Sequence, residues 1–88
     1  MPAHYAAISI TDPNDIDVVW GVGPTPEAAL RDAEWNLAEE DEVVTDLVAV
    51  PCTEAADFWV RHHGGYGPAE LRITTDGVRM RKEKVPPA

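Results

Sequence analysis

Residues 18–37 of the chain, VVWGVGPTPEAALRDAEWNL, decide the fold because they predict a strand, a turn and a helix in direct succession. Val18, Trp20 and Val22 alternate with their neighbours, which is typical of a half-buried strand. A Gly-Pro pair then ends the strand, since proline cannot continue a ladder of backbone hydrogen bonds. The stretch therefore contains one junction between a sheet and the helix that follows it.

Thr25 and Pro26 mark the start of this helix. Threonine is a favoured N-cap, and proline is tolerated at the first helical position because its missing N–H would have no partner there. At 100° per residue, one stripe of small and apolar side chains faces the sheet. Its members are Pro26, Ala29, Leu30, Ala33 and Leu37. Trp35 points away from the stripe, either exposed as a binding anchor or covered by a loop or the C-terminal tail.

Residues 5–11 supply a partner strand for the opening stretch. Ala6, Ile8 and Ile10 fall on one face of that strand by the period of two. The segment DPND at 12–15 suits a type I turn, with proline at its second position. The two strands are therefore predicted to pair as an antiparallel hairpin.

The second half of the chain predicts another strand and another helix. Residues 47–50, LVAV, form a wholly apolar run, which is typical of a strand covered on both faces. Thr53 can cap a helix that stops at Gly64 and Gly65. Most of its circumference is apolar, so this helix too is expected to pack on the sheet.

Asp76 and Gly77 predict a hairpin near the C-terminus, because Asp-Gly is a strong signal for a two-residue turn. With these two residues in the turn, Arg72 faces Arg81 across the strands. Alternate residues point inward: Leu71, Ile73, Val78 and Met80.

These elements predict an α/β (α+β) fold, a two-layer sandwich in the order β-β-α-β-α-β-β. We expect one mixed, mostly antiparallel sheet with two helices packed on it around a single core. Residues 1–84 would form a single small domain. Residues 85–88 would form a flexible C-terminal tail.

The net charge of −9 is unevenly distributed along the 88 residues. Residues 1–71 carry 14 acids and two arginines, whereas residues 72–88 carry five bases and two acids. An acidic body repels nucleic acid and anionic membranes and attracts basic proteins. A single cysteine, no apolar run of membrane-spanning length and no signal peptide indicate a cytoplasmic protein.

No motif in the sequence carries convincing catalytic or metal chemistry. The turn Gly21-Val22-Gly23 lacks the third glycine and the lysine of a phosphate-binding loop. His62 and His63 lie about 100° apart on a helix and do not converge on one ion. We therefore predict no catalytic residue, no metal and no cofactor. A small metal or thiol protein centred on Cys52, His62 and His63 is kept as an alternative.

The segment GPTPEAALRDAEWNL resembles the strand-to-helix element of HicB-type antitoxins. That family has a Gly-x-Thr-x-Glu-Ala turn before such a helix, and the chain approximates it with Pro26 inserted in the pattern. The matching residues are Thr25, Glu27, Ala28 and Ala29. The family's further strand, its Pro-x-x-Pro-Gly-like segment and its DNA-binding module are not found in this sequence, so the resemblance concerns the turn and the helix alone.

The sequence therefore predicts a non-enzymatic, small acidic module that occupies the surface of a basic partner protein. In size and charge it resembles phage- or plasmid-encoded inhibitors such as antitoxins and anti-CRISPR proteins. The predicted partner contacts are Asp32, Trp35, Glu39, Glu40, Asp41 and Glu42.

A secondary basic surface consists of Arg72, Arg79 and Arg81. Like charges that face each other across a hairpin are destabilising, so a negative group is expected near them. It could be the protein's own acidic helix, a second copy or, least favoured, a nucleic-acid phosphate. The alternative function is accordingly a structural homo-oligomer that pairs the basic hairpin of one copy with the acidic helix of another.

Overall fold

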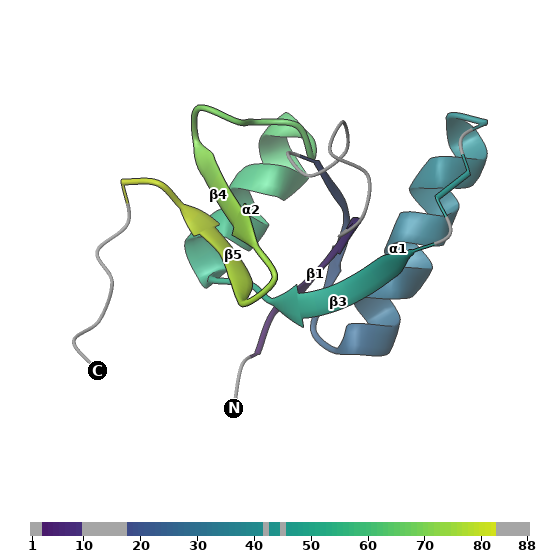
Figure 1. The fold of residues 1–88 in the computed structure, drawn as a ribbon, viewed down its shortest axis with the longest axis horizontal. Coiled ribbons are helices and arrows are strands. Elements are labelled where there is room, and N and C mark those ends of the chain that lie inside the picture. The colour runs from purple at the N-terminus through teal and green to yellow at the C-terminus, as the bar shows by residue number, and fades with distance from the viewer. Residues whose placement is uncertain (1–2, 10–17, 42, 45, 83–88) are drawn as a thin grey trace.

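The computed structural model describes residues 3–9, 18–41, 43–44 and 46–82 of the chain. Within them, strands and helices follow the predicted order β-β-α-β-α-β-β (Figure 1). They are β1 (Tyr5–Ser9), β2 (Val19–Gly23), α1 (Pro26–Glu39), β3 (Leu47–Pro51), α2 (Glu54–His63), β4 (Leu71–Thr74) and β5 (Gly77–Met80). The predicted α+β sandwich is confirmed. The turn predicted at 12–15 and the tail predicted at 85–88 lie outside the described residues.

The strands lie in two antiparallel sheets, where the sequence predicted one mixed sheet. β1 is the middle strand of a three-stranded sheet in the order β2-β1-β3, and β4 pairs with β5. One isolated parallel bridge, between Cys52 and Val78, connects the two sheets. The amide of Thr53 donates a hydrogen bond to the carbonyl of Val78, with an N···O distance of 3.0 Å.

β1, and not the apolar run at 47–50, is the strand that is buried on both faces. Residues 6–9 are each at most 2 % exposed. β3 lies at the edge of its sheet, and its first three residues are only half-buried. Hydrophobicity misled the prediction because β1 is rich in alanine and serine. Alanine is only weakly apolar and serine is polar, but the small volume of both side chains allows other elements to pack closely on both sides.

A β-bulge in β2 determines which of its residues face each side of the sheet. The register of β1 against β2 shifts between Ala7 and Ile8, so that Trp20 has no partner residue on β1. Strict alternation predicted Trp20 and Val22 on one face. Val22 instead packs with Val19 in the larger core, and Trp20 packs on the opposite side against the α1 cluster.

The two helices cover opposite faces of the three-stranded sheet (Figure 1). Neighbouring residues of β1 show this, because successive side chains of a strand point to opposite faces. Ala7 packs with Ala29 and Ala33 of α1. The larger cluster lies between the sheet, α2 and the β4–β5 hairpin: Ala6, Ile8, Val19, Val22, Val50, Cys52, Ala56, Val60, Leu71 and Val78. The single core expected from the sequence is therefore divided into two.

Gly21 allows α1 to lie close to β2. A Cβ atom at this position would be 2.3 Å from the backbone nitrogen of Ala33 and 2.5 Å from the carbonyl oxygen of Ala29. Backbone atoms cannot move away as a flexible side chain could, so only glycine fits here.

Both helices begin at the predicted caps, and α2 also ends where the sequence predicts. The Thr25 hydroxyl accepts a hydrogen bond from the amide of Ala28 at 3.1 Å, and the Thr53 hydroxyl accepts one from Ala56 at 3.2 Å. α2 ends at Gly64, whose φ of 90° favours glycine. Local hydrogen bonding therefore fixes the ends of these elements.

The C-terminal hairpin has a different register from the predicted one. Thr74 pairs with Gly77, which places Thr75 and Asp76 in the turn. The Thr74 hydroxyl donates to the carbonyl of Gly77 at 3.1 Å and accepts from the amide of Asp76 at 3.2 Å. The Thr74 side chain thus stabilises a turn at Thr75-Asp76. The turn lies one residue earlier in the chain than the predicted Asp76-Gly77 turn, which is therefore wrong.

Candidate functional site

The outer face of α1 carries most of the residues predicted to contact a partner. Trp35 is 68 % exposed, which decides between the two positions that the sequence left open for it. Glu39, Glu40 and Asp41 are also exposed. Glu39 follows Trp35 by four residues, and residues four apart share one face of a helix. We call Trp35, Glu39, Glu40 and Asp41 the α1 surface. Glu42, also predicted as a contact, lies outside the described residues.

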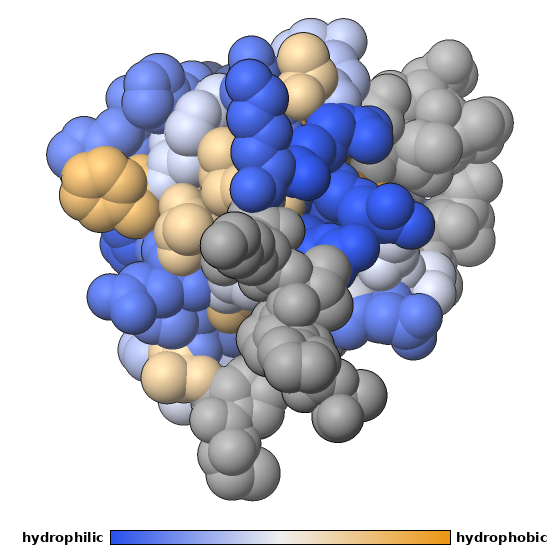
Figure 2. All heavy atoms as spheres, turned by 90° about the vertical axis from the view of Figure 1, so that its left-hand side faces the viewer, coloured by the Kyte–Doolittle hydropathy of each residue, from blue (hydrophilic) through white to orange (hydrophobic). Residues whose placement is uncertain are grey.

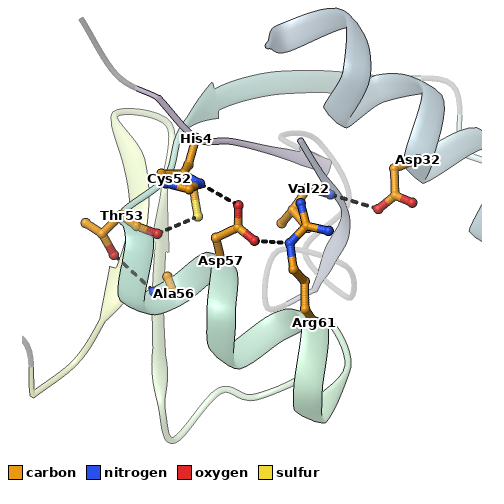
Figure 3. Close-up of polar contacts among 8 residues, drawn as sticks. All are labelled: His4, Val22, Asp32, Cys52, Thr53, Ala56, Asp57 and Arg61. Atoms are coloured by element: carbon orange, nitrogen blue, oxygen red, sulfur yellow. Dashed lines mark hydrogen bonds and ion pairs between the residues drawn. The ribbon is translucent and has the colours of Figure 1, made fainter. Parts of the chain in front are cut away.

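Asp32 has a different environment from these four residues. It is half-buried, and its Oδ2 accepts a hydrogen bond from the amide of Val22 at 3.0 Å (Figure 3). One turn later, Asn36 Nδ2 donates to the carbonyl of Trp20 at 2.8 Å. β2 is an edge strand of its sheet, so these side chains bind backbone groups on its outer side. Asp32 thus holds α1 to β2, and its role as a partner contact stays a prediction.

An open groove of about 700 Å³ runs along the outer edge of β2. Glu39 and Glu40 line it on the α1 side, and Arg61 and Tyr66 line it on the opposite side. The acidic end of α1 therefore borders a concave surface and not only open solvent.

A polar cluster around one buried carboxylate joins α2 to the residue that precedes β1. Asp57 is only 3 % exposed, and its Oδ2 is 2.7 Å from Nδ1 of His4 (Figure 3). Its other oxygen, Oδ1, accepts from Nε of Arg61, four residues later on the same helix. A buried carboxylate needs such partners because an unpaired charge is costly in a protein interior.

The sequence placed Asp57 in the first turn of a helix but missed its burial. The spacing between Asp57 and Arg61 was a local signal for half of the cluster, since such pairs meet on one helix face. His4 lies 53 residues before Asp57, and nothing in the sequence connected the two. This long-range contact is the part of the site that only the structure provides.

Cys52 lies next to this cluster, and its contacts are those of a packed core residue. Its amide donates to the carbonyl of His4 at 2.9 Å. The residue is 7 % exposed, and Sγ lies 3.4 Å from the carbonyl oxygen of Thr53, to which it donates. A reactive thiolate is typically accessible and stabilised by nearby positive charge. The burial of Cys52 favours a structural role for it.

His62 and His63 lie exposed at the C-terminal end of α2 and have different neighbours. The His62 ring packs on Phe58 with centroids 4.2 Å apart, and the His63 ring stacks on Trp59 at 4.8 Å. No three His, Cys, Asp or Glu residues in the described part of the chain are grouped so as to hold a metal ion. α2 packs on the sheet as expected through Ala56 and Val60, whereas Phe58 on the same helix is 64 % exposed.

The basic surface lies on the β4–β5 hairpin. Arg72 faces Arg79 across the two strands, and not Arg81 as predicted. Arg81 instead donates from Nε to the carbonyl of Pro68 at 2.7 Å. Among residues 3–9, 18–41, 43–44 and 46–82, no ion pair is formed by Arg72 or Arg79. The acidic helix of the same chain therefore does not compensate these two charges.

Neither helix of the described residues is long and apolar enough to cross a membrane. Comparisons of the chain with protein-family models, with curated proteins and with solved structures find no match.

Proposed function

We propose that the protein is a non-enzymatic binding module that uses the α1 surface to occupy a basic surface of a partner protein. The observation that carries this proposal is the exposure of Trp35 one turn before the exposed Glu39, with the exposed carboxylates of Glu40 and Asp41 directly after the end of the helix. Tryptophan is enriched among the residues that dominate binding energy at protein interfaces. Trp35 would supply most of the binding energy, and the negative charges of the α1 surface would favour a basic partner.

The expected contribution of Trp35 to binding is large. A tryptophan side chain can bury roughly 150–250 Å². At about 25 cal/mol per Å², covering the exposed part of Trp35 would contribute on the order of 3 kcal/mol. The acidic residues around it would act mainly on the association rate and on the choice of partner, because charges at the rim of an interface steer the encounter.

The scaffold behind the α1 surface supports this role. Small residues hold the inner side of α1 against the sheet, and Asp32 and Asn36 bind it to the edge of β2. A helix fixed in this way needs little further ordering when a partner binds, and such preorganisation increases affinity.

Affinity capture from the native host with three baits tests the proposal. The first bait is the wild type, the second is Trp35→Ala, and the third reverses the charges Glu39→Lys, Glu40→Lys and Asp41→Lys. We expect a basic protein to be recovered with the wild type and lost with both variants. A triple reversal at Glu54, Glu70 and Asp76, which are exposed acids on other elements, makes the same change in net charge and serves as the matched control.

The control bait should recover the partner as the wild type does. Recovery that is the same for the wild type and for both α1 variants would contradict the proposal. Circular dichroism of each bait verifies that it is folded.

A further inference from the structure

The outer face of the β4–β5 hairpin holds two positive charges that no described residue neutralises. Arg72 and Arg79 are directly opposite each other, and opposed residues in antiparallel strands have Cβ atoms about 4.5–5.5 Å apart. Like charges directly opposite each other on paired strands are destabilising, so this pair is expected to weaken the free hairpin. An anion that binds both guanidinium groups would reverse this effect.

The two arginines line a hollow of about 440 Å³. The other described polar side chains that line it are Thr53, Thr74 and Asp76, and Pro51 lines it as well. Thr53 is the N-cap of α2 and lies beside β5 through its hydrogen bond to Val78. The positive end of the α2 dipole is therefore at the border of the hollow.

The balance of charge in the hollow is positive. Among the described residues that line it there are two guanidinium groups, of Arg72 and Arg79, and one carboxylate, that of Asp76. Figure 2 looks at the side of the molecule that carries β4 and β5, and strongly hydrophilic residues gather there. The hollow thus combines a concave shape with a local charge opposite to the net charge of the protein.

We propose that this hollow binds the phosphate group of a small phosphorylated ligand between Arg72 and Arg79. A guanidinium presents a planar pair of N–H donors that fits phosphate oxygens in a bidentate manner. A phosphate dianion has enough charge and enough acceptor oxygens for both arginines, and the hollow has room for a small organic group as well.

A single small phosphate group fits this site better than a nucleic acid or a second copy of the chain. A nucleic acid is a polyanion, and a second copy of the chain has a net charge of −9. The acidic remainder of the protein would repel both of them. The hairpin and α1 are separate elements, so this proposal does not depend on the function proposed for the α1 surface.

Nuclear magnetic resonance titrations test the phosphate site. The probes are inorganic phosphate and adenosine 5′-monophosphate, each added at constant ionic strength with sodium chloride as the balancing salt. We expect saturable shifts of the amides of Thr53, Thr74 and Val78. Arg72→Gln and Arg79→Gln should each weaken binding at least tenfold. Arg31→Gln is the control, because it removes the same charge from an exposed position on α1; this variant should bind phosphate as tightly as the wild type does.

Thermal unfolding provides a second measurement on the same proteins. Phosphate should raise the melting temperature of the wild type and of Arg31→Gln but not that of Arg79→Gln, because a ligand stabilises only the state that binds it. Without phosphate, Arg79→Gln should unfold at the same temperature as the wild type or slightly above it.

Two results would overturn the proposal. The first would be amide shifts that do not saturate with phosphate, or that are equal in the wild type and all variants. Such shifts would indicate a general effect of charge. The second is salt-sensitive self-association of the wild type that Arg79→Gln abolishes and phosphate does not, which would assign the arginines to the acidic helix of a second copy.

Discussion

The two faces of the three-stranded sheet are packed in different ways. On one face, Ala29 and Ala33 of α1 pack on Ala7 of β1. The helix also lies so close to β2 that only glycine fits at position 21. On the other face, branched side chains fill the space to α2 and the hairpin, and a buried carboxylate lies among them. Close packing with small residues uses only a narrow stripe of a helix. The comparison thus explains how α1 is held firmly while half of its circumference, including Trp35, stays exposed.

The largest effect is expected for Gly21→Ala, which disrupts the α1 face. The added methyl group would meet backbone atoms of α1, so the helix must move away from β2. We expect a loss of about 3 kcal/mol or more in the free energy of unfolding, measured by urea denaturation. Gly64→Ala is the control, because no atom lies within 4 Å of a Cβ there and only its backbone conformation is strained, at roughly 1–3 kcal/mol. Equal stability of the two variants would contradict the close packing.

The next effect is expected for Asp57→Ala, which acts on the opposite face. Removing the buried carboxylate separates His4 from α2 and should destabilise the protein by roughly 2–3 kcal/mol, since both partners are partly exposed and can be hydrated. His4→Ala leaves the contact with Arg61 and should cost about 1 kcal/mol. Urea denaturation measures both variants. If His4→Ala is as damaging as Asp57→Ala, the carboxylate is not the centre of the cluster.

The helix caps should show effects of about 1 kcal/mol on each side of the sheet. Thr25→Ala removes the hydroxyl that caps α1, and Thr53→Ala removes the one that caps α2. Serine at each position retains the hydroxyl and should restore most of the lost stability. Melting temperatures of the four variants provide the test, and an alanine variant as stable as its serine counterpart would disprove the cap.

The smallest effect on stability is expected for Trp35→Ala. Its side chain is exposed, so the free energy of unfolding should change by less than about 0.5 kcal/mol. Trp59→Ala is the matched control, because Trp59 is partly buried against the larger core and its loss should cost about 3 kcal/mol. Chemical denaturation of both variants would show whether Trp35 contributes to the fold. A large loss for Trp35→Ala would assign it to packing and not to binding.

The sequence was sufficient for those parts of the fold that depend on neighbouring residues. The helix caps are local features. Thr25 and Thr53 each accept a hydrogen bond from an amide three residues later, and the end of α2 depends on the backbone conformation of Gly64 itself. The apolar stripe of α1 follows from the period of the helix. The exposed position of Trp35 was one of two possibilities, because coverage by a distant segment cannot be recognised from spacing.

The sequence did not predict contacts between distant segments of the chain. It also did not predict a turn that is stabilised by hydrogen bonds from a side chain to the backbone. The Thr74 hydroxyl shifts the hairpin register, although Asp76 and Gly77 were the stronger turn signal. The burial of Asp57 depends on His4 at the other end of the chain. The central position of β1 depends on the order of strands, which the composition of single strands does not determine.

The hydrogen bonds from α1 to the outer edge of β2 also bear on aggregation. The free edge of a sheet presents N–H and C=O groups on which a strand from another molecule can pair. Asp32 and Asn36 already bind two of these groups, and the carbonyl of Gly65 accepts from the amide of Val19 at 2.8 Å. The helix that carries the exposed Trp35 thus also keeps the strand beneath it from acting as a template for fibril growth.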